Sequence, residues 1–322
     1  MILFPNAKIN LGLHVINKRS DGFHNIETVF YPIALCDALE IVPARDGRFG
    51  FTSSGLPIPG DPASNLCLKA CNLLLPEILK HCHCERSEAA GFQIRDLPER
   101  SETAGFQIRD LPERSEAASI AVDTWKQPLK IHLHKVIPMG SGLGGGSSDG
   151  TFTLLLLNDL LNLSLPKNKL IDFARKLGSD CAFFIQNSPV FATGRGDSFM
   201  PIQVDLSGYT LLLVIPNVHV STSEAYSLVN PSRHENRIRE IIAQPVSSWK
   251  ENLINDFEAP VTGKYPVIGE IKRKLYDSGA LYAAMSGSGS AVFGIFNPDT
   301  EKSFTFPGCF VWKSTANLQS NC

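Results

Sequence analysis

The residues best suited to chemistry form a glycine- and serine-rich segment over residues 138–149, which reads Pro-Met-Gly-Ser-Gly-Leu-Gly-Gly-Gly-Ser-Ser-Asp. It follows an alternating apolar segment, 129–133, and runs into a long apolar segment, 147–163, which indicate a strand and a buried helix. Glycines let the backbone turn freely and approach a ligand, and a helix start offers unpaired N–H groups at the positive end of its dipole. This order of elements predicts a phosphate-binding site.

Two familiar phosphate loops fit the segment poorly. Gly140, Gly142 and Gly145 formally match the dinucleotide-binding fingerprint. That fingerprint needs an acidic residue about 20 positions on, at the end of the next strand, whereas Asp159 lies in a helical stretch. A Walker A loop is excluded because no Gly-Lys-Ser/Thr closes the segment. A dinucleotide-dependent dehydrogenase stays as an alternative that an NADH titration would test.

Three motifs, in one order along the chain, resemble those of the GHMP kinases, the superfamily of galactokinase, homoserine kinase and mevalonate kinase. The first covers residues 5–13, Pro-Asn-Ala-Lys-Ile-Asn-Leu-Gly-Leu, and the last covers residues 285–290, Met-Ser-Gly-Ser-Gly-Ser. Between them, the phosphate loop of the family is matched by Pro138, Gly142, Leu143, Gly144, Ser147 and Ser148. The resemblance implies an α+β fold of two domains. These are a ribosomal-protein-S5-domain-2-like N-terminal domain over residues 1–205 and a ferredoxin-like C-terminal domain over residues 206–322.

Two further segments narrow the resemblance: Asp-Gly-Phe-His at 21–24 and Leu-Gly-Ser-Asp at 177–180. With Lys-Ile-Asn-Leu at 8–11, they are similar to the member that phosphorylates the 2-hydroxyl of a cytidine diphosphate–sugar alcohol conjugate, on the non-mevalonate route to isoprenoid precursors. The resemblance implies direct in-line transfer, with ATP as co-substrate, Mg²⁺ expected and the metal ligands unknown. Another GHMP kinase, of the homoserine or mevalonate type, remains an alternative. A non-catalytic binding protein on the same scaffold is a further one.

Asp180 and Lys8 are the catalytic residues that the resemblance implies. A kinase must orient a hydroxyl and accept its proton, which suits the carboxylate of Asp180. Within hydrogen-bond reach, Lys8 would hold Asp180 ionised and polarise the acceptor hydroxyl. Taken without the motifs, Asp180 is an ordinary residue flanking a helix and Lys8 is an exposed lysine on a strand. The motifs favour catalysis for both.

The glycine- and serine-rich segment 138–149 is called the glycine loop below. Its backbone N–H groups are expected to make most of the contacts with the ATP phosphates. The expected ATP-binding residues are Pro138, Gly140, Gly142, Leu143, Gly144, Gly145, Gly146, Ser147, Ser148 and Asn65. Asn65 matches a family position near the adenine and also suits a helix N-cap. Asp149 is expected to be structural, as a cap in the first turn of the helix.

Aromatic and polar side chains are expected to bind the acceptor substrate. Phe23 would stack on the cytosine and His24 would bond its edge. Asn10 shares a strand face with Lys8 by the two-residue period, and would bond the sugar-alcohol end. The expected substrate-binding residues are Asn10, Phe23, His24, Tyr31, Phe184, Thr193 and Gly287. Tyr31 and Phe184 could equally be core aromatics, and Arg195 faces either a diphosphate or solvent.

A 14-residue repeat interrupts the chain upstream of the glycine loop. Two full copies, 85–98 and 99–112, differ at one position, and residues 113–119 begin a third copy. Solenoid repeats are typically ~20 to 50 residues long and need several copies to bury a core. Long insertions in surface loops cost little stability, so a neutral insert over about residues 83–124 is favoured over a partner-binding arm. The insert is expected to be exposed and partly disordered.

The composition of this 322-residue chain indicates which classes of partner it can be expected to bind. A net charge of -2 gives no electrostatic reason to expect nucleic acid. No run approaches the ~20 apolar residues of a membrane span, and no signal peptide is expected from residues 1–8, which lack a basic region followed by a long apolar one. A cytoplasmic protein without a membrane partner is expected. Its expected partners are small molecules, ATP and the cytidine diphosphate conjugate, and the chain is expected to be a monomer or weak homodimer.

Eight cysteines are scattered along the chain. Without a secretion signal, reduced thiols are the expectation. The run His-Cys-His-Cys at residues 81–84 suggests zinc as an alternative role. Ligands at adjacent positions cannot all converge on one ion, and structural zinc sites show paired ligands at defined separations. A metal site is therefore not favoured.

Overall fold

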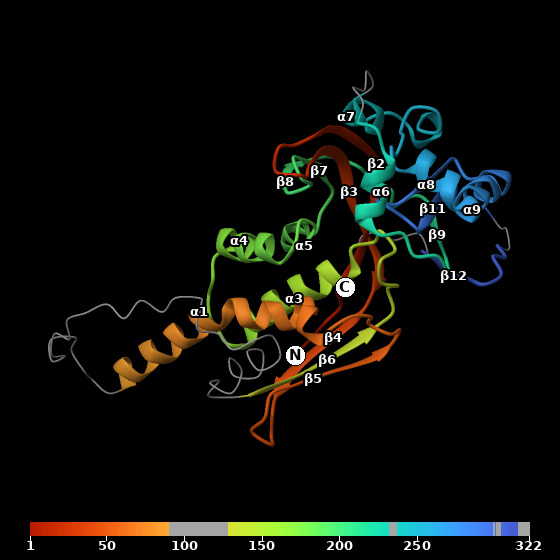
Figure 1. Ribbon diagram of the computed structural model, residues 1–322. Helices are drawn as coiled ribbons and strands as arrows, with labels where there is room; N and C mark the ends of the chain where they lie inside the picture. The colour runs from red at the N-terminus through yellow and green to blue at the C-terminus, as the bar shows by residue number, and fades with distance from the viewer. Residues whose placement is uncertain (90–127, 232–236, 299, 301–303, 315–322) are drawn as a thin grey trace.

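The computed structural model describes residues 1–89, 128–231, 237–298, 300 and 304–314, and for residues 82–89 only the backbone. Within these residues, three four-stranded sheets and the helices packed on them form the fold (Figure 1). The strand pairs are antiparallel except that of β5 with β6. This mostly antiparallel pairing, with helices on the sheets, confirms the predicted α+β class.

The first sheet carries the strand that leads into the glycine loop. Its strands, in the order β1-β4-β6-β5, are β1 (Ile2–Leu3), β4 (Ala38–Pro43), β6 (Leu129–Lys135) and β5 (Gly50–Gly55). The helices on this side are α1 (Leu66–Ala89), α3 (Gly145–Leu160), α4 (Lys167–Leu177) and α5 (Cys181–Gln186). Figure 1 shows α1 and α3 lying side by side over the sheet. The long apolar run of α3 is buried there, as its composition predicts.

The second sheet carries Lys8. Its strands, in the order β2-β3-β7-β8, are β2 (Asn6–Lys18), β3 (His24–Cys36), β7 (Val190–Thr193) and β8 (Ser198–Pro201). The turn between β2 and β3 contains Gly22 at φ +85, a conformation that favours glycine, as the Asp-Gly pair predicts. Lys8 therefore lies within β2, and Phe23 and His24 lie at the tip of the β2–β3 hairpin.

The third sheet packs against the second through a shared apolar core. Its strands, in the order β10-β11-β9-β12, are β10 (Tyr282–Met285), β11 (Val292–Phe296), β9 (Thr210–Pro216) and β12 (Cys309–Lys313). Its helices are α6 (Thr222–Leu228), α7 (Ile238–Ile242), α8 (Glu258–Lys264) and α9 (Pro266–Asp277). Two short 3₁₀ helices complete the described elements: η1 (Pro62–Ser64), before α1, and η4 (Val246–Ser248), between α7 and α8. The glycine-serine segment after β10 thereby meets the glycine loop.

Two expectations about the chain need adjustment. The insert was expected to begin near residue 83, but α1 continues to Ala89; the rest of the repeat falls at residues 90–127, outside the described part. The side chains of residues 82–84, where zinc was an alternative, also lie outside it. The expectation of reduced thiols holds for Cys67, Cys71, Cys181 and Cys309 and is wrong for Cys36. Cys36 is disulfide-bonded; it ends β3 and is only partly buried, so a second thiol can reach it. None of the described helices is long and apolar enough to cross a membrane.

Candidate active site

One pocket in the described part of the chain is a cleft of about 1340 Å³, where the glycine loop, the tip of the β2–β3 hairpin and the loops after β9 and β10 meet. It collects most of the site residues that the sequence predicts. Those lining it are Lys8, Asn10, Phe23, His24, Pro138, Gly140, Gly142, Gly144, Gly145, Gly146, Ser147, Asp180 and Gly287. Clefts that gather convergent polar groups from several elements are the usual place for a small-molecule site.

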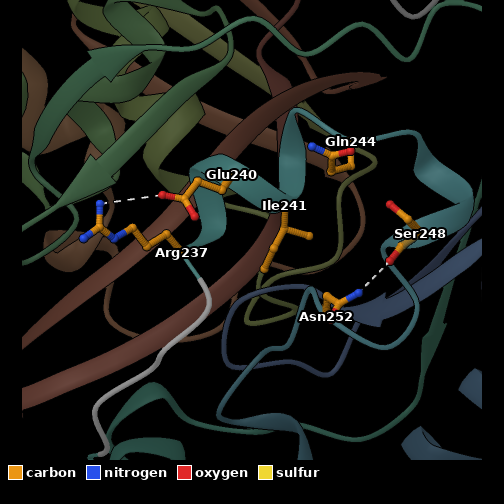
Figure 2. Close-up of a pocket in the computed structure, with 6 residues that line it drawn as sticks. All are labelled: Arg237, Glu240, Ile241, Gln244, Ser248 and Asn252. Carbon is orange, nitrogen blue, oxygen red and sulfur yellow. Dashed lines mark hydrogen bonds and ion pairs between the residues drawn. The ribbon is translucent and has the colours of Figure 1, made fainter.

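Another, smaller pocket, of about 250 Å³, lies around α7 and η4 and is lined by six residues (Figure 2). Arg237 and Glu240 form an exposed ion pair there, 3.6 Å from Nη1 to Oε1. The side chain of Asn252 donates to the carbonyl of Ser248 over 3.1 Å. Both interactions satisfy groups within this surface, and neither places a proton acceptor beside a phosphate loop. The chemistry therefore belongs to the larger cleft.

The glycine loop has the conformation that glycine alone adopts easily. Gly140, Gly142 and Gly144 have φ of +66, +80 and +72, in the left-handed region. Gly144 is the N-cap of α3, and no side chain caps this helix. The first backbone N–H groups of α3 are therefore open to an anion, as the sequence predicts for phosphate.

Ser286, in the segment after β10, holds the glycine loop from the other side. Its hydroxyl donates to the carbonyl of Gly142 over 3.0 Å, and the N–H of Ala291 donates to the carbonyl of Ser141 over 3.1 Å. A Cβ on Gly142 would lie 2.1 Å from the carbonyl oxygen of Ser286. Gly142 is thus required by close backbone contact as well as by its φ. Gly287, at φ +55, continues this contact beside Asn10.

Lys8 and Asp180 meet in the cleft as the sequence predicts. Lys8 Nζ lies 3.4 Å from Asp180 Oδ2, with side-chain exposures of 4% and 29%. Asp180 is the residue before α5, in the sharp connection after α4, and its side chain makes no capping bond. Its carboxylate is therefore held by a buried ammonium while one side remains accessible to a substrate hydroxyl.

The backbone and a second side chain fix Lys8. Its N–H donates to the carbonyl of Leu143 over 2.9 Å, and Nζ donates to Asn10 Oδ1 over 2.6 Å and to the Gly142 carbonyl over 3.3 Å. Asn10 in turn donates from Nδ2 to the hydroxyl of Thr28 over 3.0 Å. The amide of Asn10 is thus engaged with protein groups and orients Lys8. Its expected bond to the substrate stays a prediction, since it also lines the cleft.

Aromatic side chains gather at the hairpin end of the cleft. Phe23 is 54% exposed, and the Arg195 guanidinium lies 4.9 Å from its ring centroid. His24 stacks on Tyr226, with centroids 4.6 Å apart and an interplanar angle of 14°. Burial is the larger of two effects that lower the pKa of His24, and the positive charge of Lys18 is the other. Both favour the neutral imidazole. Burial raises the pKa of Tyr226 to about 12, so its hydroxyl stays protonated.

Several expected site residues do not line the cleft. Tyr31 and Phe184 are 2% and 1% exposed and belong to the apolar cores, which is the alternative that the sequence left open for both. Stacking on a base stays a prediction for them. Tyr31 is opposite Ile9 in the strand register and faces the core. Phe184 packs its ring under Gly144. Thr193 ends β7 near the cleft without lining it.

The same holds for part of the expected ATP site. Leu143 and Ser148 are 1% and 0% exposed and do not line the cleft, so their contact with the nucleotide stays a prediction. Asn65 caps the start of α1, its Oδ1 accepting from the N–H of Cys67 over 2.8 Å, which confirms the predicted cap. Its contact with adenine stays a prediction. Leu66, the next residue, does line the cleft.

Asp149 is structural, but the expected capping role is wrong. It lies in the second turn of α3 and pairs with the buried Lys135, 2.7 Å from Oδ2 to Nζ. Asp37 contacts the same ammonium. Lys135 was missed although a signal existed: the two-residue period places it on the buried face with Leu133.

Charge in the cleft suits a polyanionic ligand. The charged side chains that line it, within the described residues, are Lys8, Lys18, Arg175, Arg195 and Asp180. Basic groups therefore outnumber the one carboxylate, although the chain as a whole carries a net charge of -2. A cleft lined by one sign of charge raises the local concentration of ligands of the opposite sign. The dinucleotide alternative is not supported, because the glycine loop leads from β6 into α3, α4 and α5 before the next strand, β7, rather than into a βαβ unit.

Comparison with known proteins agrees with this geometry. Residues 113–192 match the family model of the GHMP kinases N terminal domain, and residues 238–305 match that of the GHMP kinases C terminal. The fold is similar to a crystal structure of 4-(cytidine 5'-diphospho)-2C-methyl-D-erythritol kinase, with a TM-score of 0.66 and 27% identity over 93% of this chain and 92% of that one. It is also similar to Methanococcus jannaschii mevalonate kinase, with a TM-score of 0.59 and 12% identity over 97% of each chain, which shows a shared fold.

Two curated relatives are similar over nearly the whole chain. The 4-diphosphocytidyl-2-C-methyl-D-erythritol kinase of Parabacteroides distasonis is 46% identical, over 97% of this chain and 98% of the relative. The enzyme of the same name from Cytophaga hutchinsonii is also 46% identical, over 99% and 98%. The glycine loop, the Lys8–Asp180 pair and the two-domain GHMP fold therefore have one explanation. The chain belongs to the 4-diphosphocytidyl-2-C-methyl-D-erythritol kinase family of GHMP kinases.

Proposed function

We propose that this kinase transfers the γ-phosphoryl group of ATP to the 2-hydroxyl of 4-diphosphocytidyl-2-C-methyl-D-erythritol, in non-mevalonate isoprenoid precursor biosynthesis. The observation that carries the proposal is the position of Lys8 and Asp180, 3.4 Å apart in a cleft that is also lined by the glycine loop. This loop leads into α3, whose N-terminus has no side-chain cap. A phosphate cradle and a proton acceptor facing one space are the two halves of a phosphoryl-transfer site. Residues 1–205 form the N-terminal domain in this proposal, and residues 206–322 form the C-terminal domain.

In the mechanism, backbone N–H groups from Gly140 to Ser147 hold the phosphates of ATP at the start of α3. The acceptor oxygen forms a bond to the γ-phosphorus as the bond to the β,γ-bridging oxygen breaks, and ADP leaves. Asp180 accepts the proton of the acceptor hydroxyl during this step. Lys8 stabilises the ionised carboxylate and the charge that develops at the oxygen. ATP enters as its magnesium complex, so Mg²⁺ arrives with the substrate.

The hairpin end of the cleft would bind the cytidine diphosphate part of the acceptor. Phe23 and Tyr226 offer aromatic faces to the base, and neutral His24 can donate or accept at its edge. The guanidinium of Arg195 beside Phe23 would pair with the diphosphate. Asn10 would contact the methylerythritol end beside Lys8. These assignments place the 2-hydroxyl between the base-binding end and the glycine loop.

The remaining parts of the proposal concern the setting of the reaction. We assign the enzyme to the cytoplasm, as a monomer or weak homodimer that binds small molecules rather than nucleic acid. The net charge of -2 and the basic residues that line the cleft support a small anionic ligand over a nucleic-acid duplex.

A coupled assay of ADP release tests the function on a substrate panel: the cytidyl substrate, mevalonate and homoserine. We expect turnover with the cytidyl substrate and none with the other two. Turnover with mevalonate or homoserine alone would make the chain a GHMP kinase of another specificity. Absence of turnover with all three, in a folded chain that still binds Mg-ATP, would favour a non-catalytic binding protein.

A further inference from the structure

Beneath the glycine loop lies a buried cluster of three charged side chains that the proposed mechanism does not use: Lys135, Asp37 and Asp149. The side chains of Lys135 and Asp37 are 0% exposed and that of Asp149 is 4% exposed. Lys135 Nζ contacts Asp37 Oδ2 and lies 2.7 Å from Asp149 Oδ2. The three residues come from the end of β6, the connection from β3 to β4, and the second turn of α3. The cluster therefore joins the elements on both sides of the glycine loop.

Asp37 also fixes the start of the glycine loop through its other oxygen. Oδ1 accepts from the N–H of Val136 over 2.5 Å and from that of Ile137 over 2.8 Å. The N–H of Asp37 donates to the carbonyl of Pro5 over 2.9 Å, just before the strand that carries Lys8. Hydrogen bonds to an ionised carboxylate are among the stronger ones in proteins. The buried Asp37 thus fixes the position of the backbone that follows β6 relative to the start of β2.

The ammonium of Lys135 lies directly behind the floor of the cleft. A Cβ on Gly145 would lie 3.0 Å from Lys135 Nζ and 2.9 Å from the Cγ2 atom of Ile137. Gly145 is the first residue of α3 and lines the cleft. The backbone of Gly145 therefore lies between a buried positive charge and the place where phosphates would bind. Charges interact more strongly through protein than through water, so this ammonium can act on a ligand that it does not touch.

The direction of the charges in the cluster favours an anion above it. Burial raises the pKa of the Asp149 carboxyl, and the Lys135 ammonium beside it opposes that rise. Burial lowers the pKa of Lys135, but Asp149 and Asp37 together raise it above its usual value, so the ammonium stays charged. The carboxylate of Asp37 lies toward Val136 and Ile137, whereas the ammonium lies toward Gly145. The resulting dipole has its positive end under the helix start.

We propose that Lys135 is a positioning residue for the nucleotide: held by Asp37 and Asp149, its ammonium fixes the glycine loop and attracts the ATP phosphates through Gly145. This deepens the proposed kinase function and rests on it for the kinetic measurements. A lysine that only filled space or joined elements would affect stability alone. A lysine that positions the nucleotide also affects nucleotide affinity in a protein that remains folded.

The test replaces Lys135 and compares the result with a second, partly buried ion pair whose two residues do not line the cleft. Lys135→Met keeps most of the unbranched side chain and removes its charge. The matched control is Lys272→Met, which breaks the pair of Lys272 Nζ with Glu258 Oε1, 2.6 Å apart at α9 and α8. We expect Lys135→Met to raise KM for ATP and Kd for Mg-ADP by about tenfold or more, with KM for the acceptor unchanged. Lys272→Met lowers Tm but leaves these constants at their wild-type values.

A double variant separates folding from positioning. Lys135→Met/Asp37→Asn removes the ammonium together with its ionised partner, so no unpaired charge stays buried. We expect its Tm to exceed that of Lys135→Met, while KM for ATP and Kd for Mg-ADP, measured by calorimetry, stay raised. Recovery of both constants along with Tm would overturn the proposal. So would loss of the folded state in both variants, because Lys135 would then serve folding. If the wild-type chain shows no turnover, the proposed function fails, whereas Mg-ADP binding still tests the role of Lys135.

Discussion

Lys8 Nζ and Asp180 Oδ2 lie 3.4 Å apart at the floor of the cleft, one within β2 and the other just before α5. The lysine is further held by Asn10, 2.6 Å from Nζ to Oδ1. This arrangement gives the carboxylate a fixed cationic neighbour on its buried side and leaves its other side to the substrate. A proton acceptor in this position is effective only while it is ionised and aimed at the hydroxyl.

Asp180→Asn tests this pair, because the amide keeps the size of the side chain and cannot accept the proton. We expect kcat to fall about 10²- to 10⁴-fold, with both KM values and Tm close to wild type. Steady-state kinetics and thermal unfolding measure these quantities. Asp172→Asn, on the exposed surface of α4, is the matched control and should leave kcat unchanged. A kcat within a few-fold of wild type in Asp180→Asn would remove Asp180 from the mechanism.

Gly142→Ala tests the contact between the glycine loop and Ser286. The new Cβ would meet the Ser286 carbonyl oxygen at 2.1 Å, and the residue has φ +80. We expect a loss of about 1–3 kcal/mol in the free energy of unfolding and a raised KM for ATP, because the loop must move. Urea unfolding and kinetics measure both. Gly208→Ala, where a Cβ meets nothing within 4 Å, should change neither; equal behaviour of the two variants would contradict the assignment.

Sequence patterns located the elements of the site well. Three patterns each indicate one local structure: the alternation around Ile9 a strand, the apolar run after Ser147 a helix, and Gly22 a turn. The structure has β2, α3 and the hairpin turn at these places. Local signals suffice there because helix and strand periodicity depends on near neighbours along the chain. The meeting of Lys8 with Asp180 came from motif resemblance, since no local pattern joins residues so far apart.

Side-chain direction was the part that sequence could not provide. Tyr31 was open to either interpretation until the register paired it with Ile9 rather than with Lys8, which turned its ring into the core. Pairing register depends on the partner strand, so one strand alone does not reveal it. Tyr226 gave no signal, because its contact with His24 joins the C-terminal part of the chain to the hairpin tip.

Tyr226→Ala tests whether this aromatic pair serves the acceptor. Loss of a stacked ring at 4.6 Å from His24 should raise KM for the cytidyl substrate about 3- to 10-fold and leave KM for ATP unchanged, since the ring lies at the hairpin end of the cleft. Tyr226→Phe keeps the ring and should behave like wild type. An equal rise in both KM values for Tyr226→Ala would indicate a general loss of structure instead, and Tm reports this directly.

The pH dependence of stability tests the state of Asp149. Burial raises the pKa of this carboxyl from 3.8 to about 8, with Lys135, Asp37 and the thiol of Cys67 as its ionisable neighbours. Between these two values the folded chain holds a proton that the unfolded chain has released. The contribution of Asp149 to the free energy of unfolding is therefore complete below pH 3.8 and is lost progressively as the pH rises through about 8.

Asp149→Asn removes this titration and keeps a side chain of the same shape beside Lys135. Urea unfolding at pH 5, 6, 7, 8 and 9 should show wild type losing stability with rising pH more steeply than the variant, because only wild type must release a proton from the folded state. The two curves should run parallel above the range in which Asp149 titrates. Parallel curves throughout would mean that Asp149 is ionised in the folded chain across this range, with the charge of Lys135 offsetting its burial.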